Sequence, residues 1–234
     1  FNFLAGDIDG GANTALFNIQ RFSGGTWNDV TAGTRTATST QGTGLNAFGS
    51  FAIGERITVP TCPAGGELVS GLFGSYYTVT GGFPPARPAG VPDGTRIDGT
   101  VNFNWAGGAP GVGGIGADQF SVRWDGYIYV TVSGNYRFQT QSDDGVRLWV
   151  DNMTTPVIDN WTDHASTTDT SGNVALTAGQ YYQIRLEYFE NGGQAEIRLR
   201  WEPPAGSFVA IPAGPLPTPG AGLYHCSEQQ ITGA

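Results

Sequence analysis

The chain has no lysine and few of the residues on which most catalytic and metal sites depend. All 11 of its basic residues are arginine, and it has two histidines, two cysteines and one methionine among 234 residues. Lysine-to-asparagine isopeptide cross-links, which brace some surface fibres, are therefore excluded. No nucleophile elbow accompanies His164 and His225, so a Ser-His-Asp arrangement has no support. The same shortage of histidine and cysteine argues against a zinc site.

The chain is also poor in charge and in long apolar runs. Charged residues make up 13% of the sequence, the formal net charge is -9 and the sequence pI is about 4.5. An acidic chain repels phosphate backbones, so nucleic acid is not expected as a partner. No stretch is long and apolar enough to cross a bilayer, and no signal peptide is recognisable. Because the chain starts at Phe1 rather than at a methionine, we expect a processed or excised piece.

Glycine and alternating apolar residues are abundant. The chain contains 37 glycines, which suits short strands and turns better than helices. Period-two alternation is most regular at 195–202, where Ala195, Ile197, Leu199 and Trp201 alternate with charged residues. The expected fold class is all-β.

An acidic corner lies between two alternating runs, at 134–142 and 146–152. Asp143, Asp144 and Gly145 form this corner, and two interpretations of it stay open. Asp-Gly is ordinary hairpin-turn chemistry. Alternatively, the two adjacent carboxylates bind one calcium ion, which requires a tight turn between them, and a cis Asp143-Asp144 peptide bond would provide it.

Five segments, in this order, resemble the protective-antigen-type domain, PA-14. They are GLFGSYY at 71–77, FSVRWDG at 120–126, SDDGVRLW at 142–149, IDNW at 158–161 and YFENGG at 188–193. The resemblance covers roughly residues 67–224 and implies a β-sandwich of the kind found in bacterial toxins, beside glycosidases, and in bacterial and yeast adhesins. In the adhesins a cis-linked Asp pair holds calcium, which holds sugar hydroxyls. Asp143 and Asp144 match that pair.

A second loop, at 190–194, is expected to complete the calcium site. Calcium takes about six to eight oxygen ligands, more than two aspartates supply. Asn191 and Gln194 offer amide oxygens, and the family takes ligands from this loop, although Asn-Gly-Gly is also good hairpin chemistry. Glu190 is a weaker candidate. The predicted metal ligands are therefore Asp143, Asp144, Asn191 and Gln194.

Trp161 and His164 join Asp143 and Asp144 in the predicted carbohydrate site. A calcium ion at a shallow site would accept two neighbouring sugar hydroxyls, while loop side chains select the sugar. Trp161 could offer a face to a pyranose ring, but a core position at the end of an apolar strand is favoured. Asp163 and His164 could form a rim or be ordinary surface loop residues.

The two cysteines, Cys62 and Cys226, lie just outside the two ends of the recognised domain. A disulfide between them would join its termini and could contribute roughly 4–5 kcal/mol by the chain-entropy argument. The alternative is two unpaired buried thiols. An even cysteine count, small polar residues and acidity favour an extracellular or cell-surface location.

Residues 1–58 carry strand-like runs at 15–22, 27–31, 34–40 and 47–53. They resemble the closing half of immunoglobulin-like bacterial surface domains, which often end in a run such as FAIG at 51–54. Four strands do not close a sandwich. Either upstream sequence is missing, or a neighbouring molecule adds a strand, with Phe1, Phe3 and Leu4 as a candidate donor segment.

The expected organisation is a partial immunoglobulin-like β-domain (1–58), a linker (59–66), a PA-14-type sandwich (67–226) and a tail (227–234). The expected function is calcium-dependent carbohydrate binding by a secreted or surface protein, without enzymatic activity. The alternative is a structural subunit of an extracellular fibre that assembles by β-strand addition and binds no sugar. The expected partners are glycans, bound through calcium, and neighbouring copies of the chain. Membrane insertion is not expected.

Overall fold

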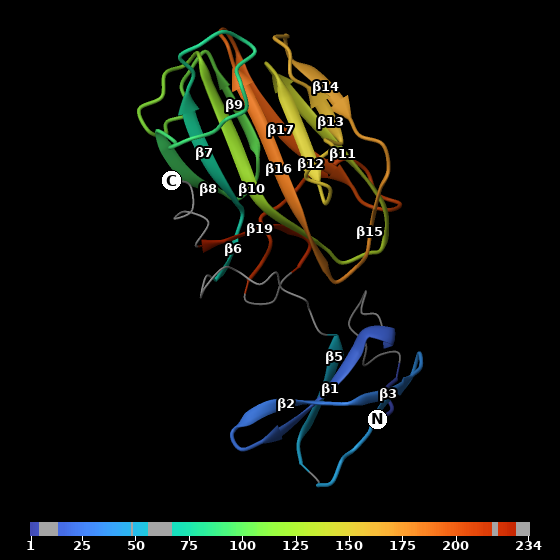
Figure 1. The fold of residues 1–234 in the computed structure, drawn as a ribbon. Helices are drawn as coiled ribbons and strands as arrows, with labels where there is room; N and C mark the ends of the chain where they lie inside the picture. Colours follow the sequence, from blue (N-terminus) through green and yellow to red (C-terminus); the bar gives the residue numbers. More distant parts are fainter. Residues whose placement is uncertain (5–13, 48, 56–66, 217–219, 228–234) are drawn as a thin grey trace. The chain divides into compact units, whose positions relative to one another are not determined.

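The computed structural model describes residues 1–4, 14–47, 49–55, 67–216 and 220–227 (Figure 1). Within these residues the secondary structure is almost entirely β-strand, so the predicted all-β fold class is confirmed. The chain divides into two compact units, Phe1–Thr58 and Val59–Ala234. No helix in the described part is long and apolar enough to span a membrane.

The first unit contains two small antiparallel sheets. A 3-10 helix, η2 (Thr14–Leu16), leads into β1 (Phe17–Ser23), which pairs with β2 (Thr26–Val30) and β5 (Phe51–Glu55). The second sheet consists of β3 (Ala32–Arg35) and β4 (Thr40–Gly42). The structure gives no separate test of the immunoglobulin-like resemblance.

The strand expected at 34–40 is wrong, because the chain turns between β3 and β4 within this run. The Thr36 hydroxyl lies 2.7 Å from the Ser39 hydroxyl and accepts the main-chain N–H of Thr38 at 3.2 Å. Threonine and serine side chains that bond to nearby backbone in this way compete with strand pairing. The threonine-rich run therefore forms a hairpin rather than one extended strand.

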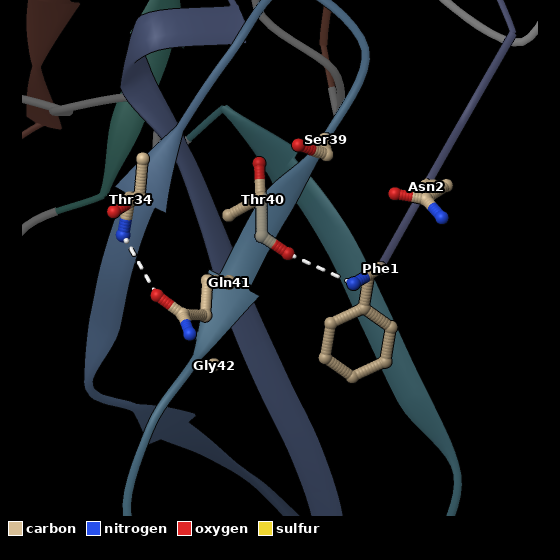
Figure 2. A pocket seen from close by; sticks show the side chains of 7 residues that line it. All are labelled: Phe1, Asn2, Thr34, Ser39, Thr40, Gln41 and Gly42. Atoms are coloured by element: carbon tan, nitrogen blue, oxygen red, sulfur yellow. Dashed lines mark hydrogen bonds between the residues drawn. The ribbon is translucent and has the colours of Figure 1, made fainter.

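The first unit has a small interior, to which the N-terminal residues contribute. Phe17 and Ile19 of β1 are buried, and β4 lies against them. The main chains of Phe1 and Thr40 exchange N–H···O bonds of 3.0 and 2.9 Å, so the N-terminal segment pairs with the edge of β4 (Figure 2). The Phe3 ring packs on Phe17 with the centroids 5.2 Å apart. The pocket in Figure 2 lies along this edge and is lined by Phe1, Asn2, Thr34, Ser39, Thr40, Gln41 and Gly42.

The second unit contains two larger sheets. The eight-stranded sheet has the order β13-β12-β16-β10-β19-β6, with β7 paired to β10 and β8 paired to β7. Its strands are β6 (Leu68–Ser70), β7 (Leu72–Thr78), β8 (Gly94–Asp98), β10 (Phe120–Val130), β12 (Val146–Val150), β13 (Ile158–Asn160), β16 (Gln180–Glu190) and β19 (Gly222–Cys226).

The six-stranded sheet has the order β14-β11-β17-β18, with β15 also paired to β11 and β9 paired to β17. Its strands are β9 (Asn102–Ala106), β11 (Gly134–Asp143), β14 (Thr167–Thr170), β15 (Val174–Leu176), β17 (Ala195–Glu202) and β18 (Val209–Ala210). The predicted alternation is confirmed in both long strands. Tyr136 and Phe138 of β11 are buried, as are Leu199 and Trp201 of β17, while their neighbours in the sequence are more exposed.

A core rich in aromatic side chains holds this unit together. Phe120, Phe138 and Tyr188 are fully buried, and the Phe120 and Tyr188 rings pack with centroids 5.9 Å apart. The Trp124 indole N–H and the Tyr76 hydroxyl each donate to Asp98 at 2.6 Å. The core therefore includes a buried carboxylate whose hydrogen bonds are satisfied by the surrounding strands.

Two further segments of this unit are shaped by close approach and by a change of sheet. β10 runs continuously through Gly126, where β19 pairs so closely that a Cβ would lie 2.3 Å from the Tyr224 carbonyl oxygen. The segment 94–106 contains two strands, β8 and β9, in different sheets. Asp98, at the end of β8, is held by Arg96 and Trp124, and the chain crosses to the other sheet after it.

The corner at 143–145 is not a hairpin turn. β11 belongs to the six-stranded sheet and β12 to the eight-stranded sheet, so residues 143–145 carry the chain from one layer to the other. The loop at 190–194 makes a similar crossing from β16 to β17, and it is not a hairpin either. Gly145 is required at the first corner because a Cβ there would lie 2.2 Å from the Phe189 ring. Both loops named by the sequence are therefore sheet-to-sheet corners.

The predicted disulfide stays a prediction. Cys226 is buried at the end of β19, but Cys62 lies outside the described residues. The expected linker at 59–66 and nearly all of the expected tail also lie outside them.

Candidate metal centre

Three carboxylates meet where the two corners adjoin. One oxygen from each of Asp143, Asp144 and Glu190 lies within 4.8 Å of the others. The Asp143-Asp144 peptide bond is cis, which gives the tight turn that the calcium interpretation required. The main-chain N–H of Phe189 donates to the Gly145 carbonyl at 3.0 Å, which joins the end of β16 to the first corner.

Asp144 is fixed in place by backbone donors from two other loops. Its Oδ1 accepts the main-chain N–H of His164 at 3.0 Å, and its Oδ2 accepts that of Asn191 at 2.9 Å. The side chain is 3% exposed. Hydrogen bonds to both oxygens hold the carboxylate in one orientation and favour its ionised form. The corner, the 161–166 loop and the 190–194 loop are therefore connected through one side chain.

Glu190 is fully buried, and one of its oxygens has no hydrogen-bond partner among the described residues. That oxygen is Oε1, whereas Oε2 lies 3.1 Å from the Tyr188 hydroxyl. The Tyr188 hydroxyl also donates to the main-chain oxygen of Asp143. A buried polar atom without a partner is costly, and such an atom next to two further carboxylates is the pattern that a cation would satisfy. The donor set consists of oxygen alone, which fits a hard divalent ion such as calcium.

The electrostatics of the cluster also favour a cation. Burial raises the pKa of Glu190 to about 8, and the negative charges of Asp144 and Asp143 contribute to this rise. Burial also raises the pKa of both aspartates, although backbone hydrogen bonds oppose the change. Three carboxylates this close cannot all ionise without a compensating positive charge. A divalent cation would supply that charge.

Asp163 and Asp118 extend the acidic character around the cluster. Asp163 Oδ2 accepts a hydrogen bond from the Asn191 side chain. Asp118 Oδ1 accepts the main-chain N–H of Gly193 at 3.3 Å, and the Gln119 N–H donates to the Asn191 carbonyl. The glycine-rich loop before β10 thus lies beside the second corner. Asp118 has no neighbouring acidic residue or motif in the sequence that could have singled it out.

Of the two metal ligands predicted in the 190–194 loop, the structure places Asn191 beside the cluster and Gln194 away from it. Asn191 lies there, with its main chain bonded to Asp144 and its side chain bonded to Asp163. Gln194 is exposed, and its amide lies near Gly107. Glu190, the weaker candidate from the sequence, supplies the third carboxylate. Glu190 is the last residue of β16, and its side chain is buried at the corner that follows this strand.

The two predicted sugar-contacting side chains differ in their surroundings. Trp161 is 8% exposed, donates to the Pro85 carbonyl at 2.8 Å and packs edge-on against Phe189. It therefore has the core position that the sequence favoured, and a stacking role for its face has no support. His164 is half-buried beside the cluster, and its Nε2 has no hydrogen-bond partner among the described residues. That nitrogen is itself buried.

The second unit matches a known domain family. The sequence profile of the PA14 domain matches residues 68–214. Because the match covers more than half of the chain, this protein belongs to the PA14 domain family. The resemblance recognised in the sequence is confirmed for this unit.

Two relatives carry anti-sigma factor names. The anti-sigma-I factor RsgI3 of Acetivibrio thermocellus is 41% identical over 107 residues, which cover 46% of this chain and 16% of that protein. The solved structure of an anti-sigma factor domain-containing protein from Clostridium clariflavum has a TM-score of 0.55 and 33% identity, over 66% of this chain and 47% of that one. The chain therefore spans less than half the length of either relative.

Two solved structures of adhesin domains share the fold. The PA14 sugar-binding domain from an RTX adhesin has a TM-score of 0.51 at 20% identity, over 61% of this chain and 95% of that one. The A domain of epithelial adhesin 9 from Candida glabrata, in complex with Galb1-4GlcNAc, has a TM-score of 0.50 at 14% identity, over 70% and 93%. At these identities the likeness shows the fold alone.

Proposed function

We propose that the PA14 unit of this chain is a calcium-dependent carbohydrate-binding module. The observation that carries the proposal is the convergence of Asp143, Asp144 and Glu190, with one fully buried Glu190 oxygen that lacks a hydrogen-bond partner in the described part of the chain. Calcium would bind to these oxygens and offset their mutual repulsion. When bound, it supplies coordination positions that sugar hydroxyls can occupy.

The chain's own residues then orient the sugar and select it. The backbone N–H groups of His164 and Asn191 hold Asp144 in position, so the carboxylate need not reorganise when the ion arrives. The exposed Asn191–Asp163 pair is the polar group beside the cluster that an incoming sugar can contact. We assign this pair to selection among hydroxyl arrangements.

The named activities of the similar proteins support the carbohydrate part of the proposal. One solved structure is described as a sugar-binding domain and another contains a galactoside. We accordingly propose a binding module without its own catalytic activity, on a secreted or surface-exposed protein. The anti-sigma factor names show that such domains also belong to regulatory proteins, so the rest of the protein decides what binding is used for.

The experiment is calorimetric titration of calcium, followed by glycan titration with Galb1-4GlcNAc and a panel of neutral and acidic oligosaccharides in calcium or in chelator. Asp144→Asn and Glu190→Gln should abolish calcium binding and the calcium-dependent part of the glycan signal. Glu202→Gln is the matched control, because it removes a half-buried carboxylate of β17 that is remote from the cluster and pairs with Arg137 of β11. Calcium binding unaffected by Asp144→Asn, or a glycan signal with no chelator-sensitive part, would overturn the proposal.

A second candidate function, assembly through β-strand addition, is favoured by one observation. The edge of β4 accepts an extended segment, since the Phe1 main chain bonds to Thr40 and the Phe3 N–H bonds to Thr38, just before this strand. The two rings pack against Phe51 and Phe17. The same edge could take a strand from a neighbouring copy. Filaments under the electron microscope that disappear after Thr40→Pro, which removes the edge N–H, would support assembly. A monomer at all concentrations in light scattering would contradict it.

A further inference from the structure

The outer face of the β1-β2 pair carries an exposed aromatic pair. In the register of these strands Phe22 lies opposite Trp27, and Gln20 lies opposite Asp29. Side chains two residues apart in a strand share a face, so these four residues lie on one surface. The buried Phe17 and Ile19 point to the opposite face. The four residues therefore face away from the interior of the first unit.

The two rings break the alternation expected of a solvent-facing strand surface. Phe22 is 44% exposed and Trp27 is 47% exposed, and their centroids lie 5.3 Å apart. Single exposed apolar residues are common, but two large rings side by side on the outer face of a sheet form a patch that needs an explanation. The rings do not fill the interior of this unit.

Among the described residues, the surface around the rings is open and has a polar margin. The next positions on this face, across β5, are Ala52 and Gly54, and a Cβ added at Gly54 would meet nothing within 4 Å. Gly24 and Gly25 at the turn are equally open. Gln20 donates to Asp29 at 3.0 Å, directly next to the rings. Within the described part of this unit, aromatic faces thus border an amide and a carboxylate.

We propose that Phe22, Trp27, Gln20 and Asp29 form a second carbohydrate site, which binds a neutral pyranose ring without a metal. A pyranose has one face of C–H groups and a rim of hydroxyls. The rings match the C–H face, and the Gln20 and Asp29 side chains can hydrogen-bond to the hydroxyls. The site lies within the first unit and is independent of the acidic cluster.

A purely local role does not account for the rings. Polar bonds already hold the β1-β2 turn, because the Asn28 amide donates to the carbonyl oxygens of Ser23 and Thr26 at 3.3 and 3.1 Å. Cross-strand aromatic pairs do stabilise hairpins. The same pair would stabilise the hairpin on the interior face too, and there the rings would also be buried. Hairpin stability therefore does not explain why the rings lie on the outer face, whereas binding of a ligand does.

The test uses the full chain carrying Asp144→Asn, in chelator, so that the acidic cluster cannot contribute. Neutral oligosaccharides of glucose, galactose and mannose are titrated, and at least one should bind. Trp27→Leu, which keeps apolar bulk but removes the flat ring, should weaken that binding at least about tenfold. Asp29→Asn and Gln20→Ala should weaken it less. Leu45→Ala is the matched control, because Leu45 is exposed in the same unit but lies beside Gly42 on the other side.

Three results would overturn the proposal. They are the absence of binding by every neutral oligosaccharide, binding that Trp27→Leu leaves unchanged, and a dimer in light scattering that Trp27→Leu dissociates, since the rings would then serve a second copy. An unchanged calorimetric melting profile establishes that Trp27→Leu still folds. Chelator and Asp144→Asn are present throughout, so the experiment reports on the aromatic site alone. A negative result therefore does not bear on the calcium proposal. Equally, a negative result for calcium binding does not bear on the aromatic site.

Discussion

The two units of this chain differ in how many of their large apolar side chains are buried. In the second unit two sheets enclose a continuous core that includes Trp124, Phe120 and Tyr188. In the first unit the fully or nearly buried apolar side chains, among the described residues, are Phe17 and Ile19, while Phe1, Phe22 and Trp27 are exposed. A large core can hold strained or charged features such as a buried acidic cluster, because the surrounding packing offsets their cost. In the small first unit, by contrast, the aromatic side chains of Phe1, Phe22 and Trp27 are exposed.

The largest expected difference between the units is the cost of removing a phenylalanine ring. Phe120→Ala should lower the free energy of unfolding by about 3–5 kcal/mol, because the ring is fully buried and leaves a cavity. Phe22→Ala should cost under about 1 kcal/mol, because the ring is already exposed. Denaturant unfolding followed by circular dichroism measures both. Similar losses for the two variants would refute the contrast.

Asp98→Ala tests whether the core of the second unit depends on its buried carboxylate. The change leaves the Trp124 indole N–H, the Tyr76 hydroxyl and the Arg96 guanidinium without their acceptor. We expect a loss of roughly 3 kcal/mol, since breaking a buried, charged network from one side is strongly destabilising. Chemical denaturation is the measurement, with Asp159→Ala on an exposed ion pair as control. A loss no greater than that of the control would contradict the assignment.

Calcium should stabilise the second unit and leave the first unchanged. At a free concentration about 100 times its Kd, an ion that binds only the folded state adds about 2.7 kcal/mol. Differential scanning calorimetry should show the gain in one transition, and Glu190→Gln should remove it. Glu202→Gln should keep it. A gain that persists in Glu190→Gln would place the ion elsewhere.

The pH dependence of the calcium-free protein should follow from Glu190. Its pKa rises from the ordinary value of 4.5 to about 8 in the folded chain, so the native state holds the proton more tightly than the unfolded chain. The stability contribution is therefore full below pH 4.5 and is lost as the pH rises toward about 8. The calcium-induced rise in Tm should be larger at about pH 8 than at about pH 5.5. Glu190→Gln should flatten the dependence, and an equal slope in that variant would disprove it.

The smallest effect is expected in the interior of the first unit. Ile19→Val removes one methylene group from a fully buried side chain and should cost about 1 kcal/mol. Because this unit has few other buried apolar groups among its described residues, its calorimetric transition should move while that of the second unit stays. A shift in both transitions would show that the two units unfold together.

Local patterns in the sequence predicted much of the fold and part of the candidate site. Alternation correctly assigned β11 and β17, and the peptide bond between Asp143 and Asp144 is cis, the geometry that the calcium interpretation invoked. Glu190, the weaker ligand candidate from the sequence, lies in the same cluster as the two aspartates. Nothing in the sequence indicated Asp118, because it reaches the site through a loop that pairs with Asn191 only in the folded chain.

The sequence by itself determined the long alternating strands, such as β11 and β17, and which of their side chains share a face, because both depend on residues one or two positions apart. Tertiary structure decided which sheet each strand joins. It made residues 143–145 a corner between two sheets rather than a hairpin turn, and it placed Phe22 and Trp27 on the outer face. The physical reason is that the partners of a strand lie far away along the chain, and only the packing of two sheets selects among the pairings that alternation permits.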